Sequence, residues 1–309
     1  MPIVDLHCDT LTVCQEAGVD LTCGQTQLSL DQIDRGEGWC QAFAVFIPDE
    51  YRGQAAVDYF CRNLAYFRRQ LEKFPGRLVQ VTTAAQIRSA LEAGKAAALL
   101  TVEGGCVLEG KEERIPWLAE EGVRMLTLTW NGANELAGGV REDTGLTEFG
   151  RAAVPLLEDS GIVVDLSHLG DKAFDQVMEI LRRPPVASHS NSRTICPHRR
   201  NLTDRQFCQI VRRGGLVGLN FFVRFLGEDP AAVDLKTLCR HIRHFVQLGG
   251  EDHLALGSDF DGADMPPCLS QAEKLAHLGE GMLELGISRQ LAEKILWKNA
   301  CCFFERYGL

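Results

Sequence analysis

Short apolar segments alternate with longer amphipathic segments along the chain. Eight of the short segments are rich in Val, Ile, Leu and Ala, a pattern that predicts buried parallel β-strands. They span residues 3–6, 39–47, 96–102, 123–129, 161–166, 185–188, 216–220 and 254–257. The segment at 78–82 predicts a further strand outside this set.

The segments between the predicted strands have helical spacing, in which apolar residues three and four positions apart share one face. The clearest stripe consists of Val57, Phe60, Leu64, Phe67, Leu71 and Phe74. Residues 270–273 predict a capping box that opens a helical region reaching Phe303. Because no linker or repeat interrupts the alternation, we predict a single domain over residues 1–309.

This alternation fits two architectures, a doubly wound open sheet and a TIM-type (β/α)₈ barrel. A Rossmann-type open sheet would carry a Gly-rich phosphate turn after its first strand. The first predicted strand ends instead in His7-Cys8-Asp9. We therefore predict an α/β fold of the (β/α)₈ barrel type.

Composition and charge restrict the partners. The chain is 45% hydrophobic and 24% charged, with a net charge of −10, which disfavours a nucleic-acid partner. No apolar segment approaches the roughly 20 residues that span a bilayer, and no secretory signal precedes the first strand. The 12 Cys residues are scattered and form no pair of CxxC motifs. We expect reduced thiols in a cytoplasmic protein without a membrane partner.

Polar residues of metal-binding type lie at the ends of the predicted strands. In a parallel barrel all carboxyl ends of the strands meet on one face, where barrel enzymes have their active sites. The residues expected to converge there are His7, Asp9, Glu103, His168, His189 and Asp259.

These residue types suit a site with two cations. His7 and Asp9 are two positions apart, so on a strand both side chains point to one face and can bind the same ion. His168 and His189 close two successive strands, and imidazole suits zinc. The two oxygens of Glu103 can bridge two ions. Taken singly, each His also fits a hydrogen-bonded core residue, and Glu103 fits a carboxylate that supports the ligands.

Asp259 is the candidate proton carrier, because its carboxylate could take a proton from a metal-bound water and pass it to a leaving group. Asp261 is its rival, with a turn or capping role as the other interpretation. The remaining histidines match no ligand position, and the first three are predicted to be at the surface. They are His198, His241, His244, His253 and His277.

Six separated motifs carry a family resemblance. They are DLHCDT at 5–10, TVEGG at 101–105, DLSH at 165–168, ASHSN at 187–191, RRN at 199–201 and GSDFDG at 257–262. In this order they closely resemble the membrane (renal) dipeptidase family of zinc peptidases. The resemblance extends from the first strand to the last helix, around Asn299.

The resemblance implies a ligand set for two Zn²⁺ ions per chain. His7 and Asp9 would hold one zinc, His168 and His189 would hold the other, and Glu103 would bridge the two.

The resemblance also implies substrate-binding residues. Arg200 matches the residue of the family that binds the substrate carboxylate, and its planar fork suits a bidentate contact. Arg199 is the rival. Trp130 stands where the mammalian renal enzymes have a substrate-contacting His, and an indole donates one hydrogen bond but carries no charge. A packing role for Trp130 is the alternative to substrate contact. Asn131 and Asn134 are interpreted as loop residues, with a polar contact in the site as the alternative.

The expected function is a binuclear zinc dipeptidase that hydrolyses the amide bond of small dipeptides. A metal-bridging hydroxide would attack the carbonyl, one zinc would stabilise the oxyanion, and Asp259 would move the proton to the amine. Another amidohydrolase-type hydrolase of small amides or esters would keep the metals but need no free carboxylate. A non-catalytic metal-binding barrel is the third alternative. A homodimer is one candidate assembly.

Overall fold

The computed structural model describes residues 1–309, and its nine strands form one parallel sheet. The strands are β1 (Ile3–Cys8), β2 (Trp39–Phe46), β3 (Leu78–Gln80), β4 (Ala96–Glu103), β5 (Val123–Thr127), β6 (Val163–Asp165), β7 (Val186–Ala187), β8 (Leu216–Leu219) and β9 (Leu254–Leu256). The neighbours follow the order β2-β1-β9-β8-β7-β6-β5-β4-β3, and a further pairing of β2 with β4 closes eight of them into a barrel. The predicted (β/α)₈ barrel is confirmed.

Strand β3 lies outside the barrel. It pairs only with the first residues of β4, from Ala96 to Ala98, whereas β5 pairs with β4 from Leu100 onwards. The amino-terminal part of β4 therefore has β2 on one side and β3 on the other. The predicted extra strand is confirmed.

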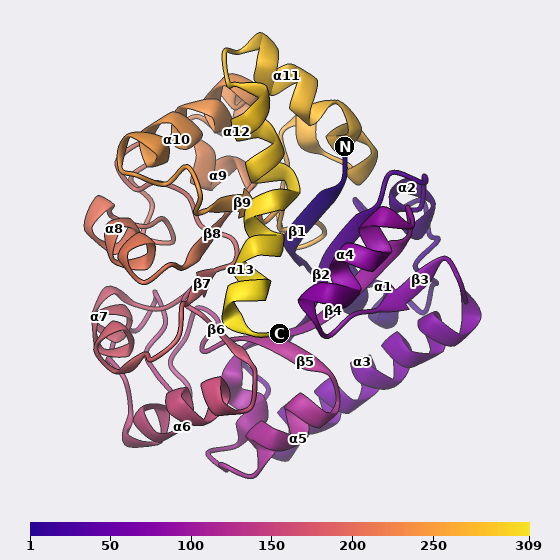
Figure 1. Ribbon diagram of the computed structural model, residues 1–309. Coiled ribbons are helices and arrows are strands. Elements are labelled where there is room, and N and C mark those ends of the chain that lie inside the picture. Colours follow the sequence, from indigo (N-terminus) through magenta and orange to yellow (C-terminus); the bar gives the residue numbers. More distant parts are fainter.

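Helices surround the barrel, as Figure 1 shows. They are α1 (Thr10–Ala17), α2 (Leu30–Ile33), α3 (Gln54–Lys73), α4 (Ala84–Glu92), α5 (Arg114–Glu120), α6 (Glu148–Asp159), α7 (Asp171–Ile180), α8 (Asp204–Arg212), α9 (Val223–Leu226), α10 (Leu235–Gln247), α11 (Leu278–Glu284), α12 (Arg289–Glu293) and α13 (Asn299–Tyr307). Helix α13, in yellow, crosses the end of the barrel at which the strands begin. No helix is long and apolar enough to cross a membrane.

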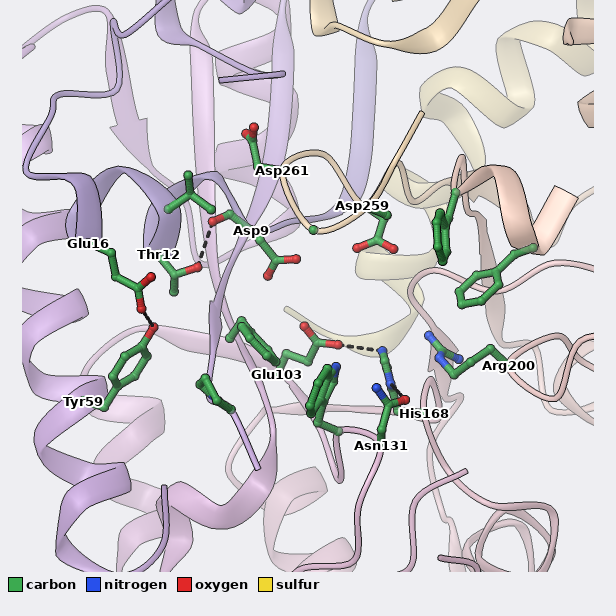
Figure 2. Close-up of a pocket in the computed structure, with 18 residues that line it drawn as sticks. Asp9, Thr12, Glu16, Tyr59, Glu103, Asn131, His168, Arg200, Asp259 and Asp261 are labelled. Atoms are coloured by element: carbon green, nitrogen blue, oxygen red, sulfur yellow. Dashed lines mark hydrogen bonds and ion pairs between the residues drawn. The ribbon is translucent and has the colours of Figure 1, made fainter. Parts of the chain in front are cut away.

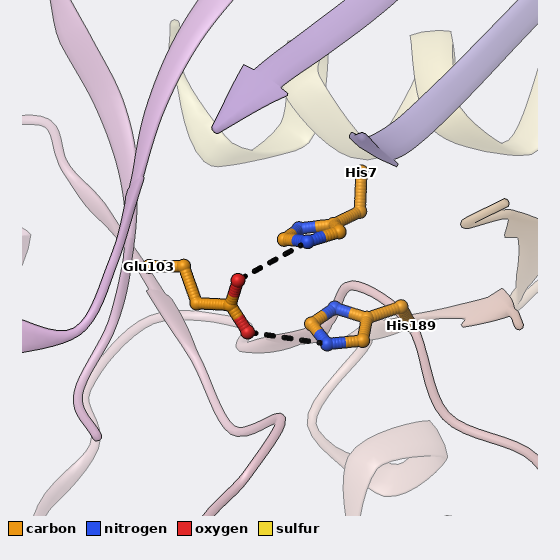
Figure 3. Close-up of side chains that lie close together, drawn as sticks. All are labelled: His7, Glu103 and His189. Carbon is orange, nitrogen blue, oxygen red and sulfur yellow. Dashed lines mark ion pairs between the residues drawn. The ribbon is translucent and has the colours of Figure 1, made fainter. Parts of the chain in front are cut away.

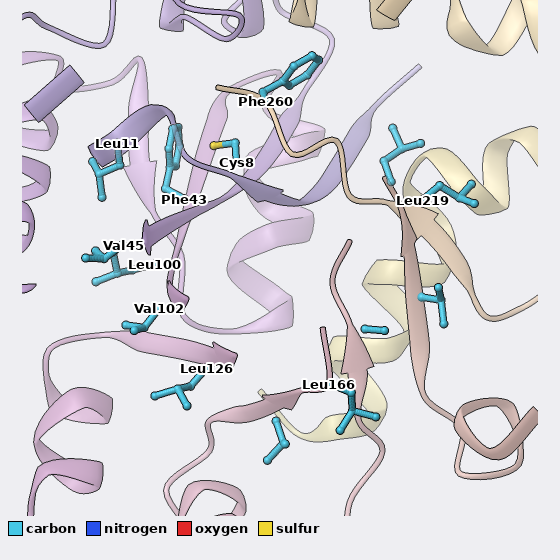
Figure 4. Close-up of a cluster of buried hydrophobic side chains, with 14 of the residues drawn as sticks. Cys8, Leu11, Phe43, Val45, Leu100, Val102, Leu126, Leu166, Leu219 and Phe260 are labelled. Carbon is cyan, nitrogen blue, oxygen red and sulfur yellow. The ribbon is translucent and has the colours of Figure 1, made fainter. Parts of the chain in front are cut away.

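On most strands the apolar side chains alternate between two clusters. On β4, Leu100 and Val102 pack in the large cluster between the strands and the helices, part of which is drawn in Figure 4. Ala97 and Leu99 belong to a second cluster, which also contains Phe303 of α13. This alternation follows from the two-residue period of a strand. Because α13 covers the amino ends of the strands, the opposite end of the barrel is left for the site.

Two glycines let the chain after β7 approach the barrel interior. A Cβ on Gly218 of β8 or on Gly257 after β9 would lie 1.9 Å from the carbonyl oxygen of Ser188. Only residues without a side chain fit this approach. Ser190 then donates its backbone N–H to the carbonyl of Gly218 at 2.8 Å. The backbone on either side of His189 is thereby fixed.

Two expectations about local structure are wrong. The segment from Ala272 to His277 is a 3₁₀-helix with no side-chain cap, and the hydroxyl of Ser270 donates to the carbonyl of Pro267 instead. The helical region that was predicted to follow is present and consists of α11, α12, a π-helical turn and α13. His241 is fully buried rather than at the surface, because it lies on the inner face of α10.

Candidate active site

The predicted site residues converge at the carboxyl ends of the strands, around a pocket of about 400 Å³ (Figure 2). His7 and Asp9 come from the end of β1, Glu103 from β4, and Asp259 from the turn after β9. His168 and His189 follow β6 and β7. Each of these six side chains is buried. A pocket of this size can hold a small molecule.

Glu103 lies at the centre of the group, with one oxygen directed to each side. Its Oε2 lies 3.4 Å from Nε2 of His7. Its Oε1 lies 2.7 Å from Nε2 of His168 and 3.6 Å from Nε2 of His189. Figure 3 shows the carboxylate beside the stacked rings of His7 and His189, with one oxygen directed to each ring. A carboxylate in this arrangement can bridge two cations.

The donor atoms fall into two overlapping groups, in each of which all atoms lie within 4.8 Å of one another. One group is His7, Glu103 and His189, and the other is His7, Asp9 and Asp259. Nε2 of His7 and Oδ1 of Asp9 are buried without a hydrogen-bond partner. Buried polar atoms are normally paired, so these two atoms point to a ligand.

Neighbouring side chains orient the rings of His168 and His189. Nδ1 of His168 lies 3.0 Å from Oδ1 of Asn131, which can only accept, so Nδ1 carries the proton. The hydroxyl of Ser188 donates to Asp165 at 2.6 Å and must therefore accept from Nδ1 of His189, 2.7 Å away. Both Nε2 atoms then carry lone pairs, although they lie only 2.9 Å apart. The two lone pairs can share a cation, and so the residues fit a metal ion.

The charges of the site perturb its pKa values in opposite directions. Burial alone would raise the pKa of Glu103, but the imidazoles of His7 and His168 that face its two oxygens outweigh it and hold that pKa well below the usual value. Burial lowers the pKa of His189, and the charge of His7 lowers it further. Burial raises the pKa of Asp259. Such shifts are typical of functional sites.

Asp259 and Asp261 have different surroundings. Asp261 accepts from the Thr10 hydroxyl at 2.6 Å and from the backbone N–H groups of Gln27 and Leu28, so its carboxylate holds a loop in place. Asp259 accepts one hydrogen bond within the chain, at 2.9 Å from Nδ2 of Asn220. Its other oxygen lies 3.8 Å from Nε2 of His7. Asp259 is therefore the carboxylate that is available for chemistry.

The adjacent residues Arg199 and Arg200 also differ in where their side chains lie. Arg200 lines the pocket and is only 5% exposed, yet no carboxylate pairs with it and its Nε has no partner. Its guanidinium lies over the ring of Phe225 and donates only to the carbonyl of His189, at 3.4 Å. Burial lowers the pKa of Arg200 to about 10. Arg199 is directed away and donates to the carbonyl of Val140.

Trp130 forms part of the pocket wall between the candidate metal ligands and β2. Its ring meets Phe46 edge-on at 5.0 Å, and the guanidinium of Arg141 lies over it at 5.2 Å. The ring centroid lies 6.4 Å from that of His168. Trp130 therefore both packs against neighbouring side chains and lines the pocket.

A family model described as membrane dipeptidase (peptidase family M19) matches residues 1–306. The chain belongs to the membrane dipeptidase family. The resemblance inferred from the six motifs is confirmed, and the chain is a metal-dependent dipeptidase by family.

One relative in sequence and two solved metallopeptidases are similar to this chain. The "uncharacterized protein in pqqA 5′ region" of Klebsiella pneumoniae is 34% identical over 254 residues, which cover 79% of this chain and 94% of that protein. The solved metallopeptidase named dipeptidase AC has a TM-score of 0.95 at 29% identity and covers 99% of this chain and 98% of its own. A metallopeptidase of Rhodobacter sphaeroides, liganded with a phosphinate mimic of the dipeptide L-Ala-D-Ala, has a TM-score of 0.94 at 28% identity and covers 99% of both chains.

Several residues of this dipeptidase site escaped the sequence reasoning. A polar contact of Asn131 was only the alternative to a loop role, and the structure shows that Asn131 contacts His168. Asn220 is the last residue of a predicted strand, so the rule that gave the candidate metal ligands would have included it too. Glu16 and Tyr59 line the pocket from α1 and α3, and no strand end marks them.

Proposed function

We propose that this chain is a binuclear zinc dipeptidase that hydrolyses small dipeptides with a free C-terminal carboxylate. The observation that carries the substrate assignment is Arg200, a buried cation in the pocket wall without an anionic partner. A buried charge is costly unless it is paired. A substrate carboxylate would supply the missing partner through a bidentate contact.

Two zinc ions are proposed to bind around Glu103. His7 and Asp9 would hold one, His168 and His189 would hold the other, and the two oxygens of Glu103 would contact one ion each. When bound, the ions would polarise the substrate carbonyl and lower the pKa of water, so that hydroxide is available near neutral pH. The unpaired Nε2 of His7 and the two facing lone pairs of His168 and His189 support this ligand set.

Asp259 would be the general base and then the general acid. The single hydrogen bond from Asn220 fixes one carboxylate oxygen and leaves the other directed towards His7. That free oxygen would accept the proton of the attacking water and donate it to the departing amine. Burial favours the protonated form of Asp259, which suits a group that must hold a proton transiently.

Trp130 would form the wall of the substrate site on the side of β2. Its ring is held by Phe46 and Arg141, so its position does not depend on the substrate. We propose that it contacts the substrate through its apolar face.

In the metallopeptidase of Rhodobacter sphaeroides the ligand is a phosphinate mimic of L-Ala-D-Ala, which supports a dipeptide as the substrate here.

The experiment that tests the proposal compares Arg200→Met with Arg199→Met. Arg199 is the matched control, since it is the neighbouring residue and lies outside the pocket. Losing one partner of a buried charge pair costs about 2–5 kcal/mol, so kcat/KM for L-Ala-D-Ala should fall about 30-fold or more in Arg200→Met. Arg199→Met should stay close to the wild type. Zinc content, measured by mass spectrometry, should be two ions per chain in all three proteins.

An amidated dipeptide distinguishes the alternative. A dipeptidase should cleave the amidated substrate poorly, and Arg200→Met should make little further difference to it. Equal turnover of free and amidated substrates by the wild type would favour another hydrolase of small amides. Zinc binding without turnover of any substrate would favour a non-catalytic barrel.

A further inference from the structure

We propose that the end of the pocket opposite Arg200 selects dipeptides whose N-terminal residue is Lys or Arg, and that Glu16 is the residue that recognises the cationic side chain. This inference rests on the proposed dipeptidase function and names the substrate class of the same site.

The barrel topology determines which end of the substrate meets which wall. Around the barrel, β2 and β7 are separated by three strands in either direction, so they face one another across the mouth. Arg200 belongs to the loop after β7, and Phe46 and Pro48 close β2. Glu103 and the other metal-binding residues lie between the two walls (Figure 2). With the substrate carboxylate at Arg200 and the amide bond at the centre, the N-terminal residue points to the wall formed by β2 and α1.

That wall has an apolar path that ends in a carboxylate. Val13, Phe46 and the ring of Tyr59 line the pocket there. Val13 is exposed at the pocket rim, so a substrate side chain that lies along this wall can contact it. Glu16 follows Val13 by one turn of α1, and its carboxylate lies at the far end of this path. A Lys or Arg side chain has the matching shape, an apolar stem with a charged head.

The carboxylate of Glu16 is held in place but not neutralised. The buried hydroxyl of Tyr59 donates to its Oε1 at 2.7 Å, and this is its one hydrogen bond within the chain. No basic side chain forms an ion pair with Glu16. A fixed negative charge at the pocket rim therefore remains available to a cation.

The α-amino group of the substrate is a poorer candidate for this position. It is bonded to the carbon next to the scissile carbonyl and so stays near the metal ligands. Glu16 is seven residues beyond Asp9 along α1, which corresponds to about 10 Å of helix. The ammonium of Lys, at the end of a four-carbon stem, extends away from the centre and towards Glu16.

The test measures kcat/KM for Lys-Ala and for norleucine-Ala, which has the same stem without the ammonium. The wild type should favour Lys-Ala by about fivefold, the equivalent of about 1 kcal/mol for a partly exposed ion pair. Glu16→Gln keeps the acceptor for Tyr59 but removes the charge, and should abolish that preference. Glu16→Lys should reverse it, so that Glu-Ala is favoured over Lys-Ala. Glu284→Gln, an exposed carboxylate outside the pocket, is the matched control and should keep the wild-type ratio.

Two outcomes would overturn this inference while leaving dipeptidase activity intact. One is a wild-type enzyme that cleaves both dipeptides equally well. The other is an equal loss for both dipeptides in Glu16→Gln, which would assign Glu16 to the α-amino group. If the zinc-loaded wild type cleaves neither dipeptide, the proposed function fails and the inference fails with it.

Discussion

Ser188 allows a direct test of how a side chain that is not itself a ligand orients a proposed metal ligand. Its hydroxyl lies 2.6 Å from Oδ2 of Asp165 and 2.7 Å from Nδ1 of His189. The same Asp165 oxygen also accepts from Thr127 at 2.6 Å, and the other accepts from the backbone N–H of Ser188 at 2.9 Å. Ser188 therefore links a rigidly held carboxylate to a proposed zinc ligand.

Ser188→Ala removes this link without changing a proposed ligand. It leaves the Nδ1–H of His189 buried without a partner, at a cost of about 1–3 kcal/mol, and frees the ring to take the other tautomer. Loss of such a supporting hydrogen bond typically lowers metal affinity by about 10- to 100-fold. We expect the zinc ion bound by His189 to be weakened by that factor.

The control is Ser190→Ala. Ser190 is equally buried and lies two residues away, but its hydroxyl has no hydrogen-bond partner. Zinc content would be measured for both variants and the wild type at a series of buffered free-zinc concentrations. Ser190→Ala should follow the wild-type curve, whereas Ser188→Ala should need more zinc for the second equivalent. Superimposable zinc-binding curves for the two variants would refute the proposed role of Ser188 in orienting His189.

Three further predictions concern the turn after β9 and the buried histidine of α10. Asp259→Asn should lower kcat by about 10²- to 10⁴-fold with two zinc ions still bound, and unchanged turnover would contradict the proton-carrier role. Gly262→Ala should lower zinc content and kcat, because its Cβ would lie 2.0 Å from Oδ2 of Asp9 and 2.6 Å from Oδ1 of Asp259. The control is Gly24→Ala, whose Cβ would meet no atom within 4 Å, and it should change neither quantity. Burial lowers the pKa of His241 to about 4 from 6.5, so the unfolded chain binds this proton first and stability falls as pH decreases from about 6.5 towards 4. Between pH 7 and pH 5, the free energy of unfolding in urea should decrease by about 2 kcal/mol less in His241→Gln than in the wild type. Equal decreases in the two proteins would contradict the assignment.

The strand positions and the convergence of the proposed metal ligands were predictable because both follow from a local rule. An apolar run identifies a buried strand, and in a parallel barrel the polar residue that follows it lies at the mouth. Glu103 and His189 were found in this way. The run at 185–188 was predicted at four residues, but β7 has only Val186 and Ala187. Pro185 has no N–H to donate, and beyond Ala187 the chain turns into the barrel interior past Gly218 and Gly257.

The supporting contacts were not predictable because they join residues that are distant in sequence. Ser188 and Asp165 are 23 positions apart, and Asn220 and Asp259 are 39 apart. Nothing near Ser188 in the sequence distinguishes it from Ser190. The error at His241 was avoidable, since Leu238, His241 and Phe245 have the three- and four-residue spacing of a buried helix face.

Hydrogen-bond satisfaction separates the reactive residues from the supporting ones in this site. Asp165 is buried like Asp259, and Asp261 is half-buried, but the bonds that these two carboxylates accept from the chain hold them in structural roles. Asp259 accepts one bond, Nε of Arg200 and Nε2 of His7 have no partner, and all three line or face the same pocket. Leaving buried polar atoms unpaired costs free energy, which the folded chain can recover when metal and substrate bind. Asp259 is also one of four non-glycine residues at positive φ, with His168 another, so backbone strain is concentrated at the same place. Three of the unpaired buried atoms, on His7, Asp9 and Arg200, and two of the four residues at positive φ thus belong to residues to which we assign chemistry.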